Sequence, residues 1–193
     1  MPKAFTFIQL SVISLMLSAV LVVIPAGADT DPELRRLLKQ AVETDFGFED
    51  EFEAQVWLLD MSKRLEKFIS DPASRIELLK TVHYEARRVD LDPELVLAVI
   101  EVESHFDEFA ISVSGARGLM QVMPFWLDEI SISDQNLFKI RTNLRMGCTI
   151  LRYYVDMEPN SLSRALARYN GSLGKTVYPS KVFKALNRNW YRH

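Results

Sequence analysis

The chain has 193 residues, of which 48% are hydrophobic and 25% charged, and its formal net charge at pH 7 is −3. This length suits one folded domain plus a short additional segment, and the composition excludes a chain that is disordered throughout. The acidic balance argues against a protein that binds nucleic-acid phosphates, and the sequence contains no glycine-rich phosphate loop. We therefore expect no nucleic-acid partner.

The cysteine and histidine content argues against a metal enzyme. The single cysteine, Cys148, excludes an intrachain disulfide and a structural zinc site built from cysteines. The three histidines, His83, His105 and His193, lack the spacing that is typical of metal ligands. We expect no bound metal.

Residues 1–28 are typical of an export signal. Lys3 supplies a positive charge near the start, residues 4–24 carry no charge, and residues 25–28 end in small side chains. Cleavage before Asp29 is the simplest prediction, and it leaves 22 basic and 26 acidic residues in an exported protein. The apolar run is also long enough to span a bilayer if it is retained, so membrane anchoring stays open.

Helical signals dominate the rest of the chain. Asp-Pro pairs at 31–32, 71–72 and 92–93 are typical of helix starts, because aspartate caps the first free N–H groups and proline suits the first turn. No segment alternates apolar and polar residues over five or more positions, so we predict an all-α fold with little or no strand. The predicted helices span residues 32–45, 50–69, 72–89, 93–105, 118–131, 137–157, 161–170 and 176–189.

Two parts of the chain differ in character. We predict an N-terminal helical extension over residues 29–72 that packs on the rest, and a main domain over residues 73–193. The extension carries one apolar stripe, made of Phe52, Val56, Leu59, Leu65 and Phe68.

Two pairs of glycines are candidate site loops, because glycine suits a sharp turn or a close approach of the backbone. These pairs are Gly115 with Gly118 and Gly171 with Gly174. The alternative is that these glycines only terminate helices.

The predicted helix that starts near Asp92 carries an acid in the middle of its apolar face. At about 100° per residue, Glu103 follows Val96 by seven residues, Val99 by four and Ile100 by three. The same apolar sector contains Leu95, Val96, Leu97, Val99, Ile100 and Val102, whereas Glu94, Glu101 and His105 lie opposite.

A carboxyl group on an apolar face is a candidate general acid. Burial disfavours the charged form and raises the pKa of the carboxyl, which a proton donor near neutral pH requires. Two structural explanations stay open at this point: Glu103 is held by an arginine or by backbone donors, or it lies at the helix end and reaches water.

The residues after this acid form a series of motifs. Glu103 and Ser104 are followed by Ala-Ile-Ser-Val-Ser-Gly-Ala-Arg-Gly-Leu-Met-Gln-Val-Met-Pro over residues 110–124. Three further blocks follow: Asn-Leu-Arg-Met-Gly at 143–147, Ala-Leu-Ala-Arg-Tyr-Asn-Gly at 165–171, and Tyr178 with Val182. Over residues 85–190 the pattern resembles the soluble lytic transglycosylase family, whose domain has a goose-type-lysozyme-like fold.

The resemblance implies a role for individual residues. Glu103 takes the catalytic position, and Ser112, Gln121 and Met123 line a groove near it. Tyr169 lies close to the carboxyl group and orients it. The remaining residues that the resemblance assigns to substrate binding or site support are Asn143, Asn170 and Tyr178. Each supporting residue also has an ordinary explanation, such as a methionine that fills the core or a half-buried tyrosine.

The family's reaction is non-hydrolytic cleavage of peptidoglycan glycan strands between N-acetylmuramic acid and N-acetylglucosamine. The resemblance implies that Glu103 acts alone as acid and base, without a metal or organic cofactor, in the periplasm or cell envelope of a bacterium. It implies peptidoglycan as partner and a membrane only if residues 1–28 are retained. The alternatives are a lysozyme-type muramidase on the same fold, a non-catalytic peptidoglycan-binding protein, and a membrane-anchored structural protein.

Overall fold

The computed structural model of the chain describes residues 51–130 and 136–191. The helix predicted at 32–45 and the signal segment lie outside these residues. Within them the regular elements are helices, so the prediction of an all-α fold is confirmed. The α-helices are α2 (Glu51–Leu65), α3 (Pro72–Arg88), α4 (Pro93–Ser104), α5 (Phe125–Ile130), α6 (Ile140–Met157), α7 (Leu162–Tyr169) and α8 (Val177–Ala185), and α8 continues into the π-helical turn η1 (Leu186–Trp190).

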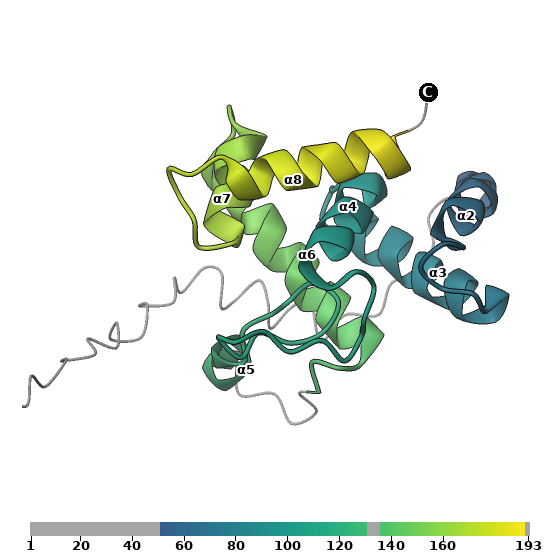
Figure 1. Cartoon of the computed structure of the whole chain (residues 1–193), viewed down its shortest axis with the longest axis horizontal. Coiled ribbons are helices and arrows are strands. Elements are labelled where there is room, and N and C mark those ends of the chain that lie inside the picture. The colour runs from purple at the N-terminus through teal and green to yellow at the C-terminus, as the bar shows by residue number, and fades with distance from the viewer. Residues whose placement is uncertain (1–50, 131–135, 192–193) are drawn as a thin grey trace, which may run out of the picture.

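Helix α6 runs through the middle of the domain (Figure 1). It packs against α3 and α7, while α4 packs against α3, α8 and η1. In Figure 1, α7 lies at the left of the molecule and the pair α2 and α3 at the right, while α8 runs along the top from α7 towards α2. None of the helices described here has the length and apolar character that crossing a bilayer requires.

Both described Asp-Pro pairs precede a helix that has proline in its first turn, but only one of the two aspartates makes a capping hydrogen bond. Asp71 caps α3 as expected, because its side chain accepts a hydrogen bond of 2.8 Å from the backbone N–H of Ser74. Asp92 precedes α4 but makes no side-chain capping bond, so Pro93 is the feature that marks this start. The three helices predicted at 50–69, 137–157 and 176–189 are also present with shifted ends.

The helix predicted from residue 118 was wrong over its first part, since α5 begins only at Phe125. Residues 110–124 form a loop held by isolated antiparallel bridges that pair Arg117 with Ile111 and with Val122. Gly118 has a φ of 72° and Gln121 a φ of 49°, and these left-handed conformations are incompatible with a right-handed helix.

The apolar stripe predicted for the N-terminal extension includes Leu59. That part of the prediction was wrong, because Leu59 is 76% exposed. Helix α2 instead packs on α3 through Trp57, Leu58 and Met61, together with Leu65 at its end. The spacing of 57, 61 and 65 follows the i, i+4, i+8 rule for one face of a helix. Leu65 was predicted correctly, and Phe68 packs partly buried against the core.

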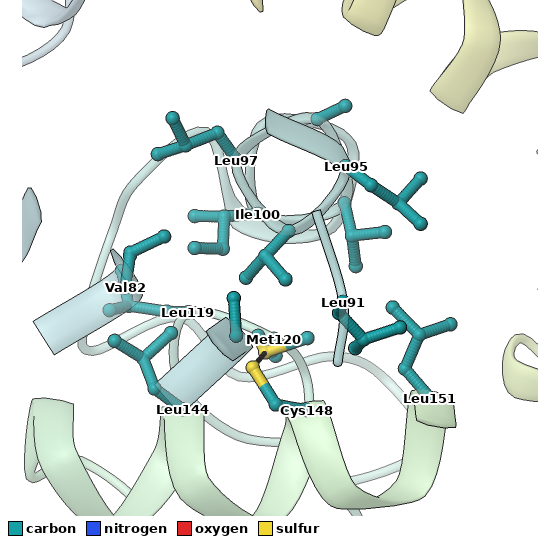
Figure 2. Packing of buried hydrophobic residues seen from close by; sticks show 14 of the residues in the cluster. Val82, Leu91, Leu95, Leu97, Ile100, Leu119, Met120, Leu144, Cys148 and Leu151 are labelled. Carbon is teal, nitrogen blue, oxygen red and sulfur yellow. Dashed lines mark hydrogen bonds between the residues drawn. The ribbon is translucent and has the colours of Figure 1, made fainter. Parts of the chain in front are cut away.

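One part of the hydrophobic core lies between α4 and α6 (Figure 2). Met120 enters it from the loop, between Ile100 of α4 and Cys148 of α6, and its sulfur lies 4.0 Å from the sulfur of Cys148. Gly147 permits this approach, because a Cβ atom at that position would lie 2.5 Å from the sulfur of Met120 and 2.7 Å from its Cβ. The loop of residues 110–124 is therefore anchored directly in the hydrophobic core.

A buried ionic cluster also joins α3 to α6. The carboxylate of Glu85 is fully buried and accepts from Arg88 at 2.7 Å and from Arg145 at 2.9 Å. Arg88 further donates to the hydroxyl of Thr149 at 2.8 Å. These contacts compensate the cost of burying the charges and fix how the two helices lie relative to each other.

Candidate active site

Glu103 lies in the last turn of α4, where the chain leaves the helix sharply. His105 and Phe106 adopt left-handed conformations, with φ values of 52° and 66°, and the N–H of His105 donates to the carbonyl of Glu101. The hydroxyl of Ser104 donates to the carbonyl of Leu119 at 2.9 Å. The helix end that carries Glu103 is thereby joined to the loop of residues 110–124.

Glu94 and Glu101, on the opposite side of α4, are partly buried and bind residues of other helices. Glu94 accepts a hydrogen bond of 3.0 Å from the indole of Trp57. Glu101 accepts from the side-chain amide of Asn189 at 2.8 and 2.9 Å and from the indole of Trp190 at 2.8 Å. Helix α4 is thus held by α2 on one side and by η1 on another, which keeps its last turn in place.

The Glu103 side chain, only partly exposed, lines a pocket of about 270 Å³. Two more of the predicted site residues line the same pocket: Asn170, at the end of α7, and Tyr178, in the first turn of α8. The full lining consists of Val102, Glu103, Asn170, Ser172, Lys175, Val177, Tyr178 and Lys181.

Burial raises the pKa of the Glu103 carboxyl, and hydrogen-bonding contacts from Tyr178 and Asn170 oppose that rise. The hydroxyl of Tyr178 is buried near this carboxyl, and within the described residues it makes no hydrogen bond of standard geometry. The phenol therefore acts on the carboxyl through proximity and not through a fully formed hydrogen bond. Burial and the charge of Glu103 together raise the pKa of Tyr178 well above its ordinary value, so Tyr178 is a neutral donor beside the acid.

Tyr169 lies near the same carboxyl but makes its hydrogen bond elsewhere. Burial and, next, the charge of Glu103 raise the pKa of Tyr169 well above its ordinary value. Its hydroxyl donates to the backbone carbonyl of Met120 at 2.7 Å. The structure therefore gives Tyr169 a contact with the loop backbone, and it is Tyr178 rather than Tyr169 that lines the pocket beside the acid.

Asn143 of α6 holds the loop from inside the protein. Its side-chain oxygen accepts from the N–H of Met120 at 2.8 Å, and its amide nitrogen donates to the carbonyls of Arg117 at 2.8 Å and Leu137 at 2.9 Å. Gly118 leaves room for it, because a Cβ atom there would lie 2.4 Å from the amide nitrogen of Asn143. Asn143 thus connects α6 to the loop without lining the pocket.

The other three predicted groove residues also lie outside this pocket. The hydroxyl of Ser112 accepts from the N–H of Ala116 at 3.0 Å. The amide of Gln121 donates to the carbonyls of Ala110 at 3.1 Å and Gly118 at 2.9 Å. Met123 packs half-buried against the core. Ser112 and Gln121 therefore shape the loop in this structure, and Met123 helps to seat it.

The sequence interpretation missed five pocket residues: Val102, Ser172, Lys175, Val177 and Lys181. A partial signal was present in the pair Gly171 and Gly174, which have φ values of 67° and 87° and shape the segment between α7 and α8. The pair Gly115 and Gly118 adopts the same kind of backbone, with φ values of 87° and 72°. Both glycine pairs therefore mark loops that border the helix end of Glu103 or its pocket.

No set of three or more His, Cys, Asp or Glu side chains within residues 51–130 and 136–191 is arranged to hold a metal ion. The polar groups that could act on a ligand in the pocket are one carboxyl, a phenol, an amide, a hydroxyl and two amines. This set can transfer a proton at Glu103 and can bind oxygen-rich or anionic groups.

The geometry agrees with the comparison to known families. The sequence model of the family described as Transglycosylase SLT domain matches residues 80–189. This stretch includes every predicted site residue, and the chain belongs to this family.

Several relatives of the chain have names that agree with this family. The chain is similar to the transglycosylase of Enterobacteria phage PRD1, with 30% identity over 56% of this chain and 42% of that protein. It is also similar to the membrane-bound lytic murein transglycosylase F of Actinobacillus succinogenes, with 29% identity over 57% of this chain and 24% of the relative. The same-named protein of Desulfosudis oleivorans is 36% identical over 51% of this chain and 23% of its own length. The match thus spans less than half of each relative.

Proposed function

We propose that this protein is a peptidoglycan lytic transglycosylase. It cleaves the β-1,4 bond between N-acetylmuramic acid and N-acetylglucosamine without water and leaves a 1,6-anhydromuramoyl end. The observation that carries the proposal is the Glu103 carboxyl, whose pKa is raised by burial inside a pocket lined by Asn170 and Tyr178. Membership of the Transglycosylase SLT domain family and the names of the relatives support it.

In the proposed reaction, Glu103 first acts as the acid. Its protonated carboxyl donates to the bridging oxygen as the glycosidic bond breaks, and positive charge develops on the muramoyl ring. The resulting carboxylate then accepts the proton of the muramoyl C6 hydroxyl, whose oxygen bonds to C1. The proton lost by the enzyme in the first step is regained in the second, and no water is consumed.

A single carboxyl suffices because the substrate supplies its own nucleophile. Ordinary glycosidases need a second carboxyl about 5–9.5 Å from the first, as nucleophile or as base for water. The pocket of this protein is lined by one acid, Glu103. Asp107 and Glu108 follow the end of α4 and do not line the pocket, and the carboxylate of Asp107 accepts from the N–H of Phe109 at 2.9 Å.

The neighbouring residues have positioning roles in this proposal. Tyr178 and Asn170 keep the carboxyl oriented and limit how far its pKa rises. Tyr169 and Asn143 fix the loop backbone at Met120, one residue before Gln121. The backbone of this loop, with Ser112, Gln121 and Met123, forms the continuation of the glycan-binding groove.

We further propose that the protein is exported and acts in the cell envelope of a bacterium. Residues 1–28 direct the export and are then removed or kept as an anchor. Residues 73–193 form the catalytic domain, and residues 29–72 form an extension whose helix α2 packs on α3. The names of the relatives as membrane-bound enzymes support the envelope as the place of action.

Mass analysis of the products tests the reaction. Purified peptidoglycan is digested with the purified protein, and the released muropeptides are compared with those from a lysozyme digest. The proposal predicts products lighter by one water than the lysozyme products. Products of equal mass to the lysozyme products would identify a muramidase instead, and binding to the wall without release would identify a non-catalytic binding protein.

A further inference from the structure

The pocket beside Glu103 has a positive wall that the proposed proton transfers do not use. Lys175, from the segment between α7 and α8, and Lys181, from α8, both line it. Both side chains belong to exposed residues, and in the described part of the chain neither forms an ion pair within 4.0 Å. In particular, neither is paired with Glu103.

The backbone directs both lysines to the pocket. Lys181 follows Tyr178 by three residues, so the two lie on the same face of α8. Lys175 follows Gly174, whose φ is 87°, and its own N–H donates to the carbonyl of Ser172 at 2.9 Å. The turn at residues 172–175 therefore fixes where the side chain of Lys175 begins.

The start of α8 adds to this positive wall. Val177, the first residue of the helix, lines the pocket, and Thr176 makes no side-chain capping bond to the free N–H groups. Uncapped N–H groups at a helix start carry partial positive charge. Because Val177 lines the same pocket as the two lysines, the helix start also contributes positive potential there.

The charge of the surrounding sequence supports the same conclusion. Residues 159–193 contain seven lysines and arginines and no aspartate or glutamate, which gives +7 in a chain whose total is −3. Arg164 and Arg168 are paired with Glu158, at 2.6 Å each. Lys175 and Lys181 form no comparable ion pair with an acidic side chain in the described part of the chain. Their ammonium groups can therefore bind an anionic group of a ligand.

We propose that Lys175 and Lys181 bind a carboxylate of the substrate beside the bond that Glu103 cleaves. This inference rests on the proposed function, because muramic acid is the sugar of that substrate that bears a carboxylate. In peptide-free glycan the lactyl carboxylate is free, and in peptide-bearing glycan the stem peptide supplies carboxylates of its own. A neutral chitin chain has neither, so the two lysines distinguish muramoyl glycan from chitin.

Binding measurements in the inactive Glu103→Gln background test this assignment. Three soluble tetrasaccharides are titrated by calorimetry: peptide-free muramoyl glycan, the same glycan with stem peptides, and neutral chitin tetrasaccharide. Adding Lys175→Gln and Lys181→Gln together is expected to weaken binding of at least one muramoyl glycan about tenfold, because each exposed charge pair contributes modestly and two are removed. Chitin binding should stay within about twofold, and the difference should vanish in about 1 M salt, where charges are screened beyond about 3 Å.

Lys184→Gln is the matched control, because Lys184 is an exposed lysine of the same helix that does not line the pocket. It should leave all three affinities unchanged. A loss confined to peptide-free glycan assigns the lysines to the lactyl carboxylate, and a loss confined to stem-bearing glycan assigns them to the peptide.

Two results would overturn the inference: unchanged affinity for both muramoyl glycans, or an equal loss for chitin. The proposed function fails separately, if the parent protein releases no anhydro products. A third outcome is that glycan binding depends on the two lysines while the released products are hydrolytic. This outcome would support the carboxylate site and contradict the proposed lytic reaction.

Discussion

At the scale of single residues, the pKa of Glu103 is a balance between burial and two hydrogen-bonding neighbours. Burial raises it, and Tyr178 and Asn170 lower it. A general acid works only while it is protonated, so the rate falls as the pH rises through this pKa. In the proposed reaction, the neighbours therefore limit the pH range over which Glu103 stays protonated.

Replacing Tyr178 by phenylalanine is expected to move that limit. Since the phenol favours the charged carboxylate, its loss raises the pKa of Glu103, and the alkaline limb of kcat/KM should shift to higher pH. The pH profile of glycan release checks this, with Tyr191→Phe as the control, because Tyr191 is exposed and does not line the pocket. A profile that stays in place or shifts to lower pH contradicts the role given to Tyr178.

The position of Glu103 could be predicted from the sequence because its signals are local. The helical period places it among Val96, Val99 and Ile100, and the motifs after it identify the family. The contacts of Tyr169 could not be predicted in the same way. Its partner, the carbonyl of Met120, lies 49 residues away in sequence and is brought near only by the packing of α7 on α6.

At the scale of elements, the loop of residues 110–124 depends on one side chain of α6. Asn143 is 1% exposed and makes three hydrogen bonds, to the N–H of Met120 and to the carbonyls of Arg117 and Leu137. The loop contains no regular ladder that could replace them, because its bridges are isolated.

Asn143→Ala is accordingly expected to lower the free energy of unfolding by about 3 kcal/mol or more, since each buried polar group left unpaired costs about 1–3 kcal/mol. Urea denaturation of the purified protein measures this difference. Asn160→Ala, at an exposed position after α6, should change it by less than about 0.5 kcal/mol. Equal stability of the two variants would show that Asn143 does not hold the loop.

The same loop explains why one predicted helix failed. Leu119, Met120, Val122 and Met123 give a run of apolar residues after Gly118 that is typical of a helix. The left-handed backbone at Gly118 and Gln121 and the hydrogen bonds to Asn143 override that local preference. Such bonds join residues more than 20 positions apart, and a local pattern carries no information about them.

At the scale of the whole molecule, the domain extends beyond the matched family region. That region begins at residue 80, whereas α2 ends at Leu65 and packs its apolar face on α3. Trp57 is 4% exposed, lies 5.1 Å from the ring of His83 and donates to Glu94 of α4. Helix α2 therefore completes the core beside the helix that carries Glu103.

Trp57→Ala should cost about 3–5 kcal/mol of stability, as expected for removal of a buried tryptophan. Thermal unfolding measures the loss, and Leu59→Ala is the control on the same helix, because Leu59 is 76% exposed. The control is expected to change stability by less than about 0.5 kcal/mol. A large loss of stability for Leu59→Ala together with a small loss for Trp57→Ala would contradict this packing. It would support the apolar stripe that the sequence predicted for α2.

The most direct measurement of the central claim is the rate at which Glu103→Gln digests purified peptidoglycan, beside the parent protein and Glu108→Gln. We predict that Glu103→Gln folds with unchanged helix content and releases no soluble muropeptide, whereas Glu108→Gln works at the parent rate. Release by Glu103→Gln at the parent rate, or loss of release in Glu108→Gln with an intact fold, would contradict the assignment of Glu103 as the single acid and base.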